Sequence, residues 1–83
     1  MTEEVLNYND INLIYITDQL LQLANYKDTR PEKRSKLVTQ ARQNLNQIKA
    51  KDYLKPYIKN LTDRINLLQN INEQIIKSSS EVN

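Results

Sequence analysis

Apolar residues recur along this chain at helical spacing in three stretches. Leucine and isoleucine are separated by three or four positions, which places them on one face of an α-helix. No stretch shows the strict alternation of apolar and polar residues that is typical of a half-buried strand. The pattern predicts helices over about residues 10–26, 30–49 and 54–77, followed by a frayed tail over residues 78–83.

The first predicted helix carries a broad apolar stripe. Asp10 precedes the stripe and is a favourable residue for capping a helix N-terminus. Four apolar residues at heptad spacing form the expected centre of the buried face: Leu13, Ile16, Leu20 and Leu23. Because three further apolar residues widen the stripe, we expect this helix to contact two neighbours, through Ile14, Leu21 and Ala24.

The second predicted helix has a clear start signal. Thr29-Arg30-Pro31-Glu32 matches a capping box, in which Thr29 would accept a hydrogen bond from the first turn and Glu32 would reach back. Pro31 lies where its missing N–H costs little. The expected apolar face is narrow and consists of Leu37, Val38, Ala41, Leu45 and Ile48. Polar residues such as Arg34 and Asn44 are expected to lie largely outside this face.

The third predicted helix is the longest. Proline disfavours the α conformation in the residue before it, so this helix begins either at Pro56 or slightly earlier, with Asp52 as its cap. A rise of 1.5 Å per residue gives this helix roughly 33 Å, against about 25 Å for the first. In an antiparallel bundle its end should therefore project by a turn or two. The seam of this helix comprises Leu54, Ile58, Leu61, Ile65 and Leu68.

These patterns predict one all-α domain over residues 1–83. The expected architecture is an antiparallel three-helix bundle with up-down-up topology, or a helical hairpin with a long third helix. A chain of 83 residues buries only about 60–65% of its unfolded surface. Its core is therefore thin, and a partner would add much to its stability.

Apolar residues near the end of the third helix exceed what the shorter helices can cover. Ile71, Ile75 and Ile76 could fold against Tyr26 and the first loop, or against Val5 and Leu6 in another topology. Alternatively they form an interface with a partner chain. Asn72 lies beside this stripe and could set the register of a helical interface. The apolar candidates for partner binding are Ile71, Asn72, Ile75 and Ile76.

Charge is divided unevenly along the chain, although the net charge is only +2. Residues 1–26 contain four acidic and no basic side chains, whereas residues 27–64 contain eleven basic and four acidic ones. Either the acidic first helix pairs with the basic second one, or a basic patch faces an acidic partner. Four cations lie in the opening turns of the second helix, where the helix dipole disfavours them. They are the basic candidates for partner binding: Arg30, Lys33, Arg34 and Lys36.

The composition removes most catalytic chemistry, because the chain contains no Gly, Cys, His, Trp or Phe. Disulfides and thiolate zinc sites are excluded, and so are glycine-rich phosphate-binding loops. We expect no enzymatic activity, no cofactor and no bound metal. No apolar run approaches 18 residues, and the acidic start Met1-Thr2-Glu3-Glu4 lacks the features of a signal peptide. We therefore expect a soluble intracellular protein, cytoplasmic or, in a eukaryote, nuclear, with no membrane insertion.

The sequence supports a nucleic-acid partner less well than a protein partner. Tyr53, Lys55, Tyr57 and Lys59 interleave aromatic and basic side chains, as in some nucleic-acid surfaces. However, helical spacing places both tyrosines with the apolar seam, and four acidic residues interrupt the basic segment. We therefore expect a protein partner or self-association through helices.

The segment from Thr29 to Leu68 resembles the helical immunity proteins that accompany small antimicrobial peptides of low-GC bacteria. The resemblance rests on a short helix with an alanine-centred face, a turn containing an aromatic residue and proline, and a long Leu/Ile helix. It implies an antiparallel helical bundle that protects a membrane receptor. The pattern is equally similar to small subunits of helical multi-protein assemblies. Our leading hypothesis is such an adaptor subunit, and the alternatives are an immunity-type protein and a small phage or plasmid regulator that contacts nucleic acid.

Overall fold

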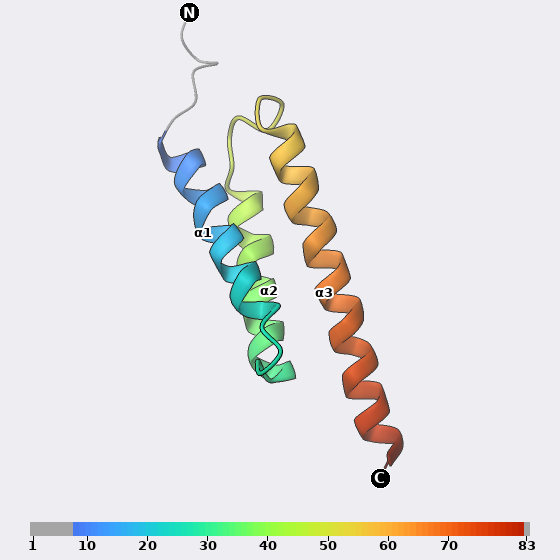
Figure 1. Cartoon of the computed structure of the whole chain (residues 1–83). Coiled ribbons are helices and arrows are strands. Elements are labelled where there is room, and N and C mark those ends of the chain that lie inside the picture. Colours follow the sequence, from blue (N-terminus) through green and yellow to red (C-terminus); the bar gives the residue numbers. More distant parts are fainter. Residues whose placement is uncertain (1–7, 83) are drawn as a thin grey trace, which may run out of the picture.

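The computed structural model describes residues 8–82, with side chains up to residue 78, and contains three helices. They are α1 (Tyr8–Ala24), α2 (Pro31–Asn46) and α3 (Lys55–Val82). Figure 1 shows that α1 and α2 form an antiparallel hairpin and that α3 runs antiparallel to α2. No strand occurs among residues 8–82. The predicted all-α three-helix bundle with up-down-up topology is confirmed.

Asp10 does not cap α1, because this helix begins two residues earlier, at Tyr8. The side chain of Asp10 is buried instead. One carboxylate oxygen accepts a hydrogen bond from the backbone N–H of Lys49 at 3.1 Å, and the other accepts one from that of Ala50 at 2.9 Å. Both amides belong to the connection between α2 and α3. Asp10 therefore attaches that connection to α1, a role that its position at a predicted helix start concealed.

The buried face of α1 is rotated away from the predicted seam. Ile16 and Leu23 are exposed, whereas the fully covered positions lie to one side of them, at Asp10, Thr17, Leu21 and Ala24. The covered set includes a carboxylate and two small side chains, so apolarity alone did not identify it. Thr17, Ala24 and, on α2, Ala41 are fully buried. Their small volumes leave room for close packing of the hairpin.

The predicted capping box at the start of α2 is wrong. Arg30 occupies the N-cap position in an extended conformation and makes no side-chain capping hydrogen bond. The Thr29 hydroxyl donates instead to the carbonyl of Leu23 at 2.7 Å, which closes the connection between α1 and α2. Pro31 is the first residue of the helix, as predicted. The helix ends at Asn46, three residues before the predicted boundary.

The third helix begins at Lys55 with Pro56 in its opening turn, as the second predicted start allows, but Asp52 does not directly precede the helix and is therefore not its cap. It continues to Val82, so the predicted frayed tail over residues 78–82 is wrong. No glycine or proline follows Pro56, and nothing in the local sequence therefore breaks the helix after Lys77.

The core is one apolar cluster to which all three helices contribute. It confirms most of the predicted faces of α2 and α3, although Leu37 and Ile58 are only partly buried. Asn44, expected outside the face of α2, is buried as well. The cluster consists of Leu21, Ala24, Val38, Ala41, Leu45, Ile48, Leu54, Leu61, Ile65 and Leu68.

Candidate interaction surfaces

Asn72 marks the level at which α3 leaves the rest of the bundle. Its buried side-chain amide donates to the carbonyl of Pro31 at 3.0 Å, and Pro31 is the first residue of α2. From Asn72, α3 continues for ten residues to Val82, which corresponds to roughly 15 Å. Figure 1 shows this end of α3, in red, extending beyond the connection between α1 and α2. The projection expected from the helix lengths is therefore present.

Three isoleucines lie around this level and on the projecting end. Ile71, Ile75 and Ile76 are 40%, 41% and 51% exposed, respectively. Tyr26, considered as a cover for them, is itself exposed. The alternative cover, Val5 and Leu6, lies outside the described residues. On the described part of the chain, the apolar stripe of α3 thus continues onto a partly exposed surface, which we call the α3 end: Ile71, Ile75 and Ile76.

Arg34 does not belong to an exposed basic patch, because the structure buries it. Its Nε donates to the carbonyl of Ala24 at 2.6 Å, and its Nη2 donates to that of Tyr26 at 3.3 Å. The carbonyl of Ala24 belongs to the last turn of α1 and that of Tyr26 follows it, at the end where the helix dipole is negative and favours a cation. Its Nη1 donates to Oδ1 of Asn72 at 3.2 Å. Arg34 and Asn72 therefore connect the three helices, and neither is available on the surface of the isolated chain.

The other predicted cations are exposed. Arg30, Lys33 and Lys36 form no ion pair within the part of the chain that the structure describes. Arg30 and Lys33 border a hollow of about 390 Å³ at the junction of α1 and α2. Lys36 does not line it. We call this feature the basic hollow, and it is lined by Leu23, Tyr26, Asp28, Thr29, Arg30 and Lys33.

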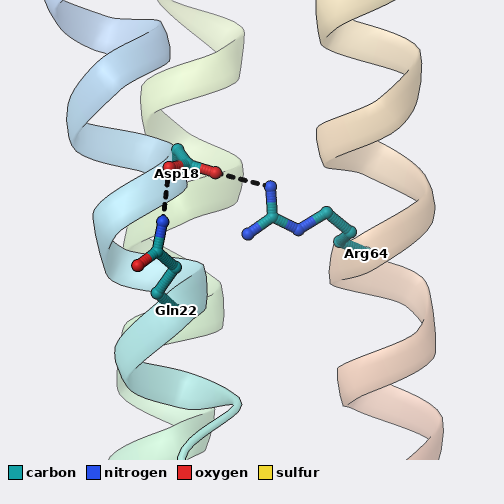
Figure 2. A network of polar contacts seen from close by, with 3 residues as sticks. All are labelled: Asp18, Gln22 and Arg64. Atoms are coloured by element: carbon teal, nitrogen blue, oxygen red, sulfur yellow. Dashed lines mark hydrogen bonds and ion pairs between the residues drawn. The ribbon is translucent and has the colours of Figure 1, made fainter.

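The acidic side chains of α1 do not neutralise these cations of α2. Asp18 forms an ion pair of 2.6 Å with Arg64 of α3 and accepts a hydrogen bond from Gln22 at 2.8 Å (Figure 2). Asp10 is engaged by backbone N–H groups of Lys49 and Ala50. The first alternative, in which an acidic first helix pairs with a basic second helix, therefore does not apply to Arg30, Lys33 and Lys36 within the described residues.

A second hollow, of about 650 Å³, is lined by residues of α1 and α3. Figure 2 shows Asp18 and Arg64 reaching toward each other from these two helices. Sequence reasoning did not find this hollow. The sequence offered two tyrosines as a signal for this hollow, Tyr15 and Tyr57, but the apolar pattern assigned Tyr57 to the buried seam. Both tyrosines are exposed in the structure. The lining includes Ile11, Ile14, Tyr15, Asp18, Pro56, Tyr57, Asn60, Leu61 and Arg64.

These surfaces combine apolar, cationic and acidic side chains. Within the described residues, no group of three or more His, Cys, Asp or Glu side chains is placed to hold a metal ion. None of the described helices combines the length and the apolar character needed to cross a membrane. Comparisons with protein-family models, with curated proteins and with solved structures each find no match to this chain. The surfaces themselves therefore supply the argument for function.

Proposed function

We propose that this chain is a non-catalytic protein-interaction module, a small adaptor or structural subunit that binds a partner protein through the α3 end. The observation that carries the proposal is the partial exposure of Ile71, Ile75 and Ile76 where α3 passes the hairpin. An apolar helix face that its own bundle leaves uncovered is a common docking element for a partner helix or groove.

The energy available at the α3 end is large relative to the stability of a small domain. Full burial of an isoleucine side chain contributes about 1.5–3 kcal/mol. Since Ile75 and Ile76 are already partly covered in the isolated chain, burial of each in an interface contributes roughly half of that free energy. Together they could change a dissociation constant by about one to two decades.

The test is the double substitution Ile75→Ser with Ile76→Ser in the full chain. A matched control is Ile16→Ser in α1, because this side chain is 47% exposed and lines none of the hollows described above. Light scattering and copurification from the native organism measure self-association and partner binding. We expect the α3 double variant to lose partner binding and the α1 variant to retain it. Both should remain helical by circular dichroism.

One combination of results would contradict the proposal. If the wild type is monomeric and copurifies with no protein, and the α3 double variant unfolds, Ile75 and Ile76 serve the fold of the isolated chain. A variant that folds and still captures the same partner would also exclude the α3 end as the binding surface.

A further inference from the structure

We propose that the basic hollow is a second binding site, whose occupant is an acidic peptide segment that inserts an apolar side chain. The site is formed by the end of α1, the start of α2 and their connection. It is distinct from the α3 end, so the proposed function and this inference can fail independently.

The apolar part of the site consists of Leu23 and Tyr26. Both side chains are exposed although they line a concave surface. Their backbone is held in place, because the Thr29 hydroxyl donates to the carbonyl of Leu23 and Arg34 donates to that of Tyr26. The hollow is therefore preformed, which reduces the entropy lost when a ligand binds.

The cationic part of the site consists of Arg30 and Lys33. Neither side chain makes a hydrogen bond or an ion pair with another described residue. Both lie at the N-terminus of α2, where the helix dipole favours anions and makes cations unfavourable in the isolated chain. Bound carboxylates would relieve that unfavourable placement. Charge complementarity thus selects an acidic occupant.

The geometry favours a short acidic segment over a nucleic acid. Arg30 at the N-cap and Lys33 in the first turn of α2 are separated by three positions, and both line the hollow. That spacing suits two carboxylates one helical turn apart. Asp28 also lines the hollow and repels any anion, so only the positions beside Arg30 and Lys33 favour a negative charge, whereas a phosphate backbone needs a longer row of cations. An apolar residue directly before or after this pair of carboxylates lies on the same side of a helical segment and would contact Leu23 and Tyr26.

The experiment is a selection of displayed helical peptides against the immobilised full chain. Two positions separated by three vary among Glu, Gln and Lys, and the positions directly before and after this pair vary among Leu, Tyr and Ser. We expect enrichment of Glu at both positions of the pair, with Leu or Tyr directly before or after it. Fluorescence anisotropy of the selected peptide should show weaker binding at high salt, since exposed charges are screened.

Variants of the chain locate the binding site. Arg30→Gln with Lys33→Gln should weaken binding of the selected peptide about tenfold or more, since it removes both charge contacts. Leu23→Ser should also weaken it. The matched control is Lys51→Gln with Lys55→Gln, two exposed lysines in the connection between α2 and α3 and at the start of α3, and it should bind like the wild type. Circular dichroism checks that every variant folds.

Several results would overturn the inference. They are the absence of enriched peptides, enrichment without a preference for Glu, and peptide binding that survives Arg30→Gln with Lys33→Gln. The inference also fails if a DNA oligonucleotide binds through Arg30 and Lys33 while Leu23→Ser has no effect. If peptides are enriched for apolar residues alone and bind through Ile75 and Ile76, this inference fails and the proposed function stands.

Discussion

The parts of α3 before and after Asn72 both carry large aliphatic side chains, and these have different surroundings. Leu61, Ile65 and Leu68 are at most 5% exposed, whereas Ile75 and Ile76 are 41% and 51% exposed. Ile75 continues the seven-residue spacing of Leu61 and Leu68, and Ile76 lies next to it. The difference arises because α1 and α2 meet in a short connection near Asn72 while α3 continues. An apolar stripe therefore identifies a helix face, and the lengths of the neighbouring helices decide whether that face is core or surface.

The largest expected effect separates the two parts of α3 directly. Leu68→Asp places a charge in the core, and burial of an unpaired charge costs several kcal/mol, comparable with the whole stability of a small domain. We expect this variant to be unfolded by circular dichroism. Ile75→Asp should fold, because its carboxylate can reach water. Equal loss of helical signal in both variants would show that Ile75 is as much a core residue as Leu68.

A smaller effect is expected at the boundary between the two parts. Asn72→Ala leaves the carbonyl of Pro31 and one N–H of Arg34 without their side-chain partner. Loss of such buried hydrogen bonds should lower the free energy of unfolding by about 1–3 kcal/mol. Asn70→Ala is the matched control on an exposed face of the same helix and should be nearly neutral. Urea denaturation measures both, and equal values would show that Asn72 does not hold α3 to α2.

The smallest expected effect has the opposite sign and lies in the covered part of the bundle. The hydroxyl of Thr17 is buried and has no hydrogen-bond partner among the described residues. Thr17→Val removes this unsatisfied group with little change in volume and should raise the free energy of unfolding by about 1 kcal/mol. The exposed residue Thr39 provides the control, since Thr39→Val changes no buried group. A destabilised Thr17→Val variant would indicate that the hydroxyl has a partner.

Helical periodicity was sufficient to predict the fold class, the three helices and most of the core of α2 and α3. It failed on α1, where Asp10 and Thr17 occupy the buried face and Ile16 and Leu23 do not. The burial of Asp10 depends on hydrogen bonds from the backbone N–H groups of Lys49 and Ala50, which lie 39 and 40 residues away in the sequence. No local pattern in the sequence contains that information.

The candidate surfaces were predicted in part. Helix lengths correctly indicated the projecting part of α3, because a rise per residue is a property of the backbone. The charge pattern identified the basic cluster, but it does not show that Arg34 is buried and Lys33 is exposed. Arg34 faces the carbonyls at the end of α1 and Asn72 on α3, whereas Lys33 lines the basic hollow.

Hydrogen exchange along α3 tests the central claim most directly. It is measured residue by residue on the chain at a concentration where light scattering gives a monomer. We predict slow exchange for the amides of residues 61–72, which open only with global unfolding, and much faster exchange for residues 74–82, which can open locally. Addition of the partner protein should slow exchange in residues 74–82. Equally slow exchange through residue 82 in the monomer would contradict the claim that α3 leaves the bundle at Asn72.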